Sequence, residues 1–145
     1  MAIKRMDHVG IVVEDIAAAT SFFVELGMQV GGEGAVEGAW VGRVVGLEGV
    51  RSHIAMLKTP DGASCIELSC FDTPAGPSGH GDEPSNAPGL RHLCFNVDNL
   101  EATVERLRAH GAELVGSIEN YEDAYLLCYL RGPEGIIVEL AQDLG

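Results

Sequence analysis

Apolar residues along the chain follow a strand-like pattern and then a helix-like pattern, and this succession occurs twice. At residues 7–13 and 91–97, apolar side chains alternate with other residues or form a short run, as is typical of β-strands. Each run precedes a segment with apolar residues at helical spacing, which predicts an amphipathic helix. Asp15 and Asn99 stand just before these helices, where a short side-chain oxygen can accept from the first free amides.

The two successions belong to one internal repeat. His8 aligns with His92, and Gly27 aligns with Gly111 at the same spacing. Both glycines are expected to end their helices, because a left-handed residue without a β-carbon costs least there. Later in each half, a turn made of proline, an acidic residue and glycine precedes an apolar strand. The repeat therefore predicts two β-α-β-β-β modules.

The modules are expected at residues 4–72 and 89–143, joined by a linker at residues 73–88. The linker is rich in proline and glycine, which excludes a regular helix or strand ladder, although it could fold over a pocket as a lid. Each module alone is too small to bury much core, so the two should pack as a pair or swap with another subunit. We therefore expect residues 1–145 to form a single domain.

Chemistry-bearing residues recur at matched positions of the repeat. Glu67 and Glu139 each lie between apolar residues of a late strand, so they should face away from the helices. His8 and His92 occupy the corresponding polar positions of the first strands. Each sheet would thus present one imidazole and one carboxylate on its non-helix face. A pseudo-twofold arrangement of the two sheets would bring all four together.

Two imidazoles and two carboxylates form a sensible site for a divalent metal ion. Two neutral histidines, two ionised glutamates and one divalent cation carry no net charge, and the donors suit Ni, Co, Zn, Mn or Fe. An octahedral ion would keep about two positions for water or substrate. The alternative is a metal-free site, with hydrogen-bonded histidines and solvent-exposed glutamates. The recurrence of both residue types favours the metal.

The paired modules, with His8, Glu67, His92 and Glu139 at the ligand positions, resemble the vicinal oxygen chelate superfamily. That superfamily includes glyoxalase I, methylmalonyl-CoA epimerase, extradiol dioxygenases, fosfomycin-resistance enzymes and bleomycin-binding proteins. The resemblance covers nearly the whole chain except the linker. It implies an α+β fold in which two tandem βαβββ modules form a half-open barrel, the glyoxalase/bleomycin resistance fold. It also implies a divalent metal ion and a small-molecule substrate chelated through two vicinal oxygens.

The order His, Glu, His, Glu is similar to that of glyoxalase I, whereas epimerases tend to have glutamine at the second place. The resemblance therefore implies a metal-dependent lyase or isomerase that acts through an enediolate, with Glu139 and Glu67 as the candidate bases. A ring-cleaving dioxygenase is one alternative, although such enzymes use two histidines and one carboxylate. A non-catalytic drug- or metabolite-binding protein of the bleomycin resistance kind is another, although that branch lacks the metal cluster.

Several further residues are candidates for the substrate pocket. Trp40 lies in a glycine-rich run where the resemblance places substrate walls. Cys94 and Asn96 share the face of His92 by strand alternation. His53 lies in an expected strand without a partner in the second module, which favours a core position or a pocket wall. Three tyrosines lie in a run that favours a strand and receive no role: Tyr121, Tyr125 and Tyr129.

Composition and charge narrow the possible partners. The chain has 145 residues, 46% of them hydrophobic, and a formal net charge of −13, which argues against nucleic acid and anionic membrane surfaces. No apolar run is long enough for a signal peptide or a transmembrane helix. The four cysteines contain no C-x-x-C pair, so we expect reduced core cysteines in a cytoplasmic protein. A homodimer is expected. With only 9 Lys and Arg, no basic cluster for glutathione or coenzyme A is evident.

Overall fold

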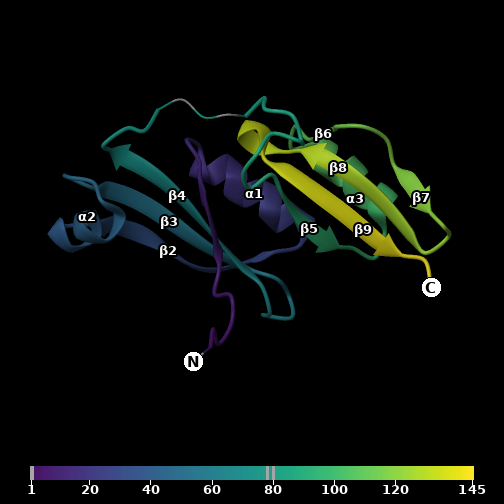
Figure 1. Ribbon diagram of the computed structural model, residues 1–145, viewed down its shortest axis with the longest axis horizontal. Coiled ribbons are helices and arrows are strands. Elements are labelled where there is room, and N and C mark those ends of the chain that lie inside the picture. The colour runs from purple at the N-terminus through teal and green to yellow at the C-terminus, as the bar shows by residue number, and fades with distance from the viewer. Residues whose placement is uncertain (1, 78, 80) are drawn as a thin grey trace. The chain divides into compact units, whose positions relative to one another are not determined.

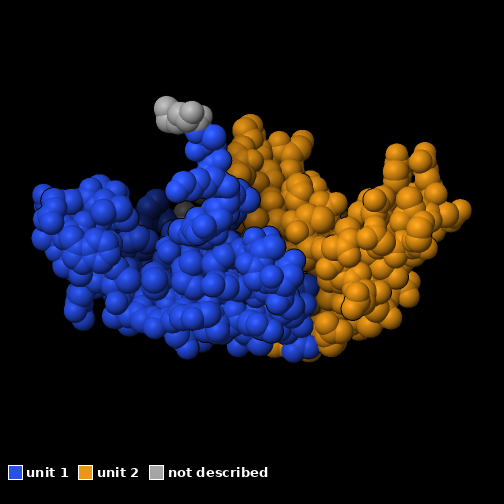
Figure 2. Space-filling model, turned by 90° about the horizontal axis from the view of Figure 1, so that it is seen from below, with its two compact units in different colours: residues 1–78 blue, residues 79–145 orange. Residues whose placement is uncertain are grey.

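The computed structural model describes residues 2–77, 79 and 81–145 (Figure 1). The chain divides into two compact units, residues 1–78 and 79–145 (Figure 2, blue and orange). This division falls within the expected linker, of which residues 78 and 80 lie outside the described part. The module limits remain predictions. Among the described residues, no helix is both long and apolar enough to cross a membrane.

The first unit is a four-stranded sheet with two helices. Its elements are β1 (Val9–Val12), α1 (Ile16–Leu26), β2 (Gln29–Glu37), α2 (Ala39–Val45), β3 (Arg51–Lys58) and β4 (Cys65–Thr73). The strands lie in the order β1-β4-β3-β2, with β1 parallel to β4 and the other pairs antiparallel. Helix α1 packs on strands β2, β3 and β4 (Figure 1).

The second unit repeats this arrangement with small departures. Its elements are β5 (His92–Asn96), α3 (Leu100–Arg108), β6 (Glu113–Leu114), β7 (Glu119–Tyr121), β8 (Tyr125–Arg131), the 3-10 turn η1 (Pro133–Gly135) and β9 (Ile137–Asp143). The strand order is β5-β9-β8-β6, and β7 also pairs with β8. Again the first and last strands are parallel, and the order of strands matches that of the first unit. The protein is therefore an α+β protein built on a duplicated unit.

Two elements were not expected from the sequence pattern. Helix α2 lies within the glycine-rich run, because its glycines mostly flank the helix. Gly38 precedes it with φ 112° and Gly46 ends it with φ 75°. Strand β7 is the second addition, and it ends at a tight turn where Glu122 and Asp123 both adopt positive φ. Left-handed geometry at two successive turn positions is unusual for these residue types, so the sequence gives little warning of it.

Both long helices begin as expected. The side chain of Asp15 accepts from the amide of Ala18 at 3.0 Å, and that of Asn99 accepts from the amide of Ala102 at 3.0 Å. These bonds satisfy amides that have no partner within the helix. The two caps occupy matched positions of the repeat, and each accepts a hydrogen bond from the amide three residues further along the chain.

The helix ends differ from each other. Gly27 follows α1 directly, with φ 125°, as expected. Helix α3 instead ends at Arg108 with Ala109 as its C-cap, so the prediction that Gly111 ends this helix was wrong by two residues. Gly111 supplies the left-handed residue (φ 84°) of the turn that follows, and the amide of Ala112 then bonds back to the carbonyl of Leu107. The helix geometry thus gives way to a turn before the glycine is reached.

The core of each unit lies between its sheet and its long helix. In β4, Ile66 and Leu68 are buried, and in β9 Val138 and Leu140 are buried. Helix α1 contributes two fully buried phenylalanines, Phe22 and Phe23, whose rings meet edge to face. Each such side chain contributes roughly 1.5–3 kcal/mol by its removal from water. This burial fixes which face of each last strand is turned away from the helix.

The start of the second unit is fastened to the loop between β8 and β9. The Arg131 guanidinium donates to the carbonyls of Gly81, Glu83 and Gly135. Gly135 adopts φ 81°, and a β-carbon on it would overlap the carbonyl oxygen of Gly81. Arg91 adds an ion pair to the Glu83 carboxylate at 3.1 Å. The linker was expected to be able to fold over a pocket as a lid. Over its described residues after 80, it is instead held against the second unit, to which it belongs.

Candidate metal-binding half-sites

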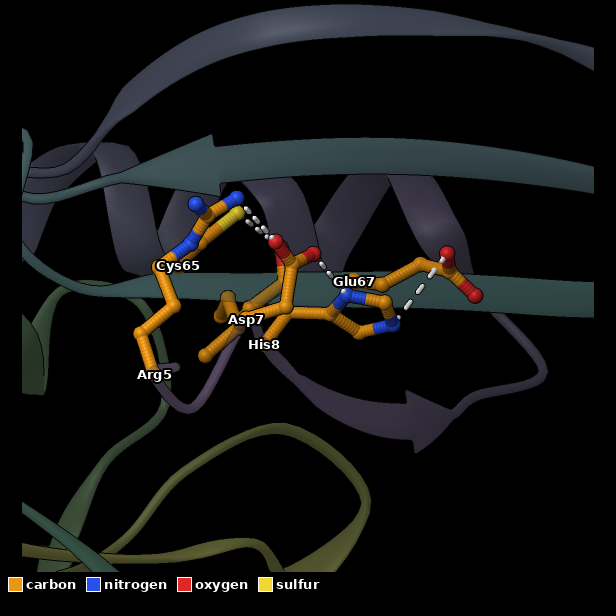
Figure 3. Close-up of polar contacts among 6 residues, drawn as sticks. Arg5, Asp7, His8, Cys65 and Glu67 are labelled. Atoms are coloured by element: carbon orange, nitrogen blue, oxygen red, sulfur yellow. Dashed lines mark hydrogen bonds and ion pairs between the residues drawn. The ribbon is translucent and has the colours of Figure 1, made fainter. Parts of the chain in front are cut away.

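The first candidate half-site pairs His8 with Glu67 (Figure 3). Glu67 lies in β4 opposite Gly10 of β1, between two buried residues, and its side chain is 31% exposed. His8 lies one residue before β1, because the strand starts at Val9 instead of at Asp7 as expected. Its Nε2 is nevertheless 3.7 Å from Glu67 Oε2. The imidazole and the carboxylate therefore meet on the face of the sheet that α1 leaves open.

Asp7 supports the imidazole of His8 from the other side. Its Oδ2 lies 2.9 Å from His8 Nδ1, and its Oδ1 accepts from Arg5 Nη2 at 2.8 Å (Figure 3). The hydrogen bond with His8 and then the Arg5 guanidinium hold the pKa of Asp7 below its usual range. An ionised carboxylate only accepts hydrogen bonds, so His8 Nδ1 is the donor. In the neutral imidazole the lone pair of Nε2 then faces Glu67.

The second candidate half-site pairs His92 with Glu139. His92 is the first residue of β5, and its Nε2 is 3.1 Å from Glu139 Oε2. Two side chains flank Glu139 in register, Cys94 on β5 and Tyr129 on β8. The Tyr129 hydroxyl lies 3.3 Å from His92 Nδ1, and the two ring centroids are 4.9 Å apart. At the matched positions of the first unit, Gly10 and Met56 flank Glu67, so the two half-sites differ in their polar surroundings.

The groups beside Glu139 are neutral near pH 7. Partial burial, the charge of Glu139 and a hydrogen bond with it raise the pKa of the Cys94 thiol to about 11. Burial, followed by the charges of Glu139 and Cys94, raises the pKa of Tyr129. A thiol with such a pKa is a poor nucleophile and stays a weak donor toward the carboxylate. Cys94 is also exposed, so the expectation of core cysteines was wrong for this one, whereas Cys128 is buried.

The donor set of each half-site fits a divalent cation. Where Nε2 carries a lone pair, that lone pair and a carboxylate oxygen repel each other unless positive charge lies between them, and a second-shell partner on Nδ1 is typical of metal-binding histidines. Within either unit, no group of three or more His, Cys, Asp or Glu side chains among the described residues could hold a metal ion. Each unit thus offers two donors. The meeting of His8, Glu67, His92 and Glu139 at one ion stays a prediction.

The other predicted pocket residues have no polar contact with the two pairs in the described structure, Cys94 excepted. Trp40 is the second residue of α2 and is 57% exposed. Asn96 lies at the end of β5 on the face of His92 and donates to Asp143 at 3.3 Å. Cys94 alone lies directly beside a candidate ligand, Glu139. A role for these three in substrate binding remains a prediction.

The first unit also contains a cavity of about 500 Å³ on the helix side of its sheet. Its lining residues come from α1, β2 and β3: Ile16, Ala17, Thr20, Glu33, Gly34, His53 and Ile54. His53 shares its face of β3 with the buried Ala55 and Leu57, and its Nε2 is 3.0 Å from Asp72 Oδ2. Because its side chain is 53% exposed, a core position for His53 was wrong and a cavity wall is correct. This cavity lies on the opposite face of the sheet from Glu67.

Two residues of the half-sites were missed in the sequence. Asp7 directly precedes His8, and an acidic neighbour is too common to stand out. Tyr129 received no role because its place beside Glu139 depends on the register of β8 and β9. The loop between these strands has positive φ at Glu134 and Gly135, which the sequence does not reveal. Counting residues outward from that loop along both strands would have paired Tyr129 with Glu139, and this was the available signal.

Residues 7–129 match the family model described as the Glyoxalase/Bleomycin resistance protein/Dioxygenase superfamily. The chain belongs to this superfamily, whose members bind small-molecule substrates and commonly use divalent metals. This agrees with the duplicated unit and with the resemblance drawn from the repeat.

Individual proteins resemble the chain over nearly its full length. A glyoxalase family protein from Bacillus cereus is 49% identical, with a TM-score of 0.97 over 100% of this chain and 97% of its own. An ethylmalonyl-CoA/methylmalonyl-CoA epimerase from Cereibacter sphaeroides is 29% identical over 97% of this chain and 98% of its own. A mutant of the fosfomycin resistance protein FosX from Listeria monocytogenes, complexed with Mn(II) and 1S,2S-dihydroxypropylphosphonic acid, is 13% identical. Its TM-score is 0.63, over 96% of this chain and 90% of its own, and shows a shared fold.

Proposed function

We propose that the chain is a metal-dependent lyase or isomerase that removes a proton next to a carbonyl group of a small substrate. The observation that carries this proposal is the recurrence of one pair in both units. A histidine Nε2 faces a glutamate Oε2 on the open face of each sheet, at 3.7 Å in the first unit and 3.1 Å in the second. Neither pair has a role in the core, so folding alone does not account for them. Their joint ligand is a divalent ion, which could be Ni, Co, Zn, Mn or Fe.

The similar proteins support this class of chemistry. The epimerase from Cereibacter sphaeroides is named for a proton-transfer reaction at a carbon of an acyl thioester. FosX, which shares only the fold, is complexed with Mn(II), so this fold can accommodate a divalent cation. The order His8, Glu67, His92, Glu139 favours a lyase, whereas the similarity to the epimerase from Cereibacter sphaeroides favours an isomerase. Both belong to the same proposal because they share the first step.

The residues of this chain would divide the work as follows. A bound divalent cation supplies positive charge that lowers the cost of the substrate enediolate. His8 and His92 would hold the cation without adding charge of their own. Glu139 and Glu67 are the candidate bases, and a glutamate that takes the proton can return it to the neighbouring carbon or to the opposite face. The first outcome is a lyase or isomerase reaction, and the second is an epimerisation.

The two glutamates are not equivalent as bases. Glu139 has the Tyr129 hydroxyl and the Cys94 thiol beside it, whereas Gly10 and Met56 flank Glu67. Glu139 therefore lies among polar groups that could orient its carboxyl group, and the two residues that flank Glu67 offer no such group. We keep Glu67 as the second base, because an epimerase needs one group on each face of the substrate.

Metal content and proton exchange together test the proposal. The purified protein should contain one divalent ion per chain by mass spectrometry, and it should exchange the α-proton of a ketone or thioester substrate with solvent deuterium. Glu139→Gln should lower both occupancy and exchange, the latter by about 10²–10⁴-fold if a general base is lost. Glu113→Gln, on β6 of the same sheet, is the control and should change neither. Unchanged metal occupancy in Glu139→Gln would contradict the ligand assignment.

The same measurements separate the alternatives. Iron together with oxygen uptake on a catechol would indicate a ring-cleaving dioxygenase. Absence of metal together with tight stoichiometric binding of an aromatic compound would indicate a drug- or metabolite-binding protein. We also propose a homodimer, and light scattering on the eluting protein would contradict it by giving the mass of one chain, 15.3 kDa.

A further inference from the structure

The cavity on the helix side of the first sheet is separate from the candidate metal-binding half-sites. Its volume of about 500 Å³ is within the range of sites that hold small molecules. Its walls come from the start of α1, the middle of β2 and β3, all within the first unit. Glu67 pairs in register with Met56 and faces the other side of the sheet, so a metal ion held there would not occupy this cavity.

The lining of the cavity combines apolar surface with a few polar side chains. Ile16 and Ala17 of α1 offer apolar surface against which the hydrocarbon part of a ligand can pack. The polar side chains in the lining are the Thr20 hydroxyl, the Glu33 carboxylate and the His53 imidazole. Such a combination is typical of a site for a molecule with an apolar body and one polar end.

Glu33 and His53 are diagonal neighbours across the β2–β3 ladder. Glu33 is paired with Ala55 and His53 with Ala35, so both side chains lie on the helix face of the sheet. Diagonal neighbours of this kind are about 7–8 Å apart, so one small group between them can contact both. Among the residues that the structure describes, the Glu33 carboxylate has neither a hydrogen bond nor an ion pair. A positively charged group with N–H donors would complement it.

The charge around this part of the cavity is negative. Asp72 lies beside His53, and its Oδ2 is 3.0 Å from His53 Nε2. The carboxylates of Glu33 and Asp72 outweigh one imidazole, whether or not that imidazole is protonated. Arg51 lies two residues before His53 but is paired with Glu37 at 3.4 Å. Charge complementarity therefore favours a cation here and disfavours an anion.

The donor set points to an organic cation and not to a metal ion. In the described part of the chain, no group of three or more His, Cys, Asp or Glu side chains could hold a metal. We propose that this cavity is a second ligand site, which binds a small molecule with a protonated amine and an apolar body. The ammonium group donates to Glu33 beside the ring of His53, and the body packs against Ile16 and Ala17. This site is independent of the proposed function, which concerns the opposite face of the sheet.

Three probes of similar size and different charge test the site in the wild-type protein: 2-phenylethylammonium, 2-phenylethanol and 3-phenylpropionate. Each is titrated into the ¹⁵N-labelled chain at constant pH and followed by amide ¹H–¹⁵N spectra. The ammonium probe should give saturable shifts at Thr20, Glu33 and Ile54, with a Kd of about 1 mM or below. The alcohol should bind at least about threefold more weakly, and the carboxylate should not bind. Equal binding of ammonium and alcohol, or no saturable shift at about 10 mM ammonium probe, would overturn the proposal.

Two matched pairs of variants locate the site. Glu33→Gln removes the carboxylate charge and should weaken binding of 2-phenylethylammonium by about three- to tenfold. Glu48→Gln makes the same change in the exposed loop between α2 and β3 and should leave binding unchanged. Ala17→Leu fills the cavity from α1 and should abolish binding, whereas Ala18→Leu adds the same side chain outside the lining and should not. Unchanged binding in Glu33→Gln or in Ala17→Leu would contradict the site, and the three wild-type titrations decide the matter if a variant fails to fold.

Metal content and proton exchange separate this site from the proposed function. Glu33→Gln should keep the metal content and the exchange rate of wild type, because Glu33 and Glu67 lie on opposite faces of the sheet. A loss of either in this variant would contradict a separate site. If the ammonium probe binds in the cavity but the protein holds no metal, the proposed function fails and the second site stands. If the protein holds metal and exchanges the proton, but the probe shifts only residues of the half-sites, the reverse holds.

Discussion

Two matched turn glycines offer a quantitative test of how the second unit is held together. Gly62 lies between β3 and β4 with φ 72°, and Gly135 lies between β8 and β9 with φ 81°. Both follow a proline and an acidic residue, so they are equivalent in the repeat. They differ in their surroundings. A β-carbon at Gly62 meets nothing within 4 Å, whereas one at Gly135 overlaps the carbonyl oxygen of Gly81.

The expected cost of each alanine substitution follows from these contacts. Gly62→Ala carries only the penalty of a left-handed conformation, about 1–2 kcal/mol. Gly135→Ala carries the same penalty and must also displace the segment that starts at Gly81. That displacement breaks bonds from Arg131 to the carbonyls of Gly81 and Glu83, worth about 1.5–3 kcal/mol each when donated by a charged group. Because Arg131 is only half-buried, we take about half of that sum, which makes Gly135→Ala worse by about 1.5–3 kcal/mol.

Urea unfolding followed by circular dichroism measures both free energies of unfolding. Hydrogen exchange gives a second readout, since Gly135→Ala should speed exchange over residues 81–91 and Gly62→Ala should not. Equal losses of stability in the two variants would refute the reasoning. So would a larger loss in Gly135→Ala without faster exchange, because the displaced segment is the source of the predicted difference.

Three further predictions concern local features of the fold. Asp15→Ala and Asn99→Ala should each lower the free energy of unfolding by about 1 kcal/mol, because each removes one matched N-cap bond. Urea unfolding checks this, and a negligible loss in either would contradict it. Leu140→Ala should cost about 2–5 kcal/mol by leaving a cavity in the core of the second unit, measured in the same way; a loss below about 1 kcal/mol would show that the core collapses freely around the gap. The hydrogen bond from Thr59 Oγ1 at 2.6 Å, and then the amide of Ala63, lower the pKa of Asp61. Its stabilising contribution is therefore complete above the ordinary carboxyl pKa and is lost as the pH falls through the lowered one. Carbon-detected NMR titration should show this pKa rising in Thr59→Val, and no change would exclude Thr59 as the main cause.

Much of the fold could be predicted from local pattern. Alternation along β4 and β9 turned Glu67 and Glu139 away from the helices, because burying their apolar neighbours settles the face of every residue between them. The starts of α1 and α3 were predictable for a similar reason, since a cap acts over three residues. Helix α2 and strand β7 were not predictable. They depend on positive φ at residues such as Gly38 and Glu122, which carry no pattern.

The sequence by itself determined that one small unit occurs twice and that each copy carries a histidine and a glutamate on the same open face. These properties follow from the alternation of side chains along each strand. That alternation is local and does not depend on how the strands and helices are arranged in space. Only the tertiary structure decided that the carboxylate of Asp7 turns toward Nδ1 of the neighbouring His8. It also decided that Tyr129 lies opposite Glu139, with its hydroxyl within reach of His92. Such contacts depend on loop conformation and cross-strand register, and both are fixed by packing between residues far apart in the chain.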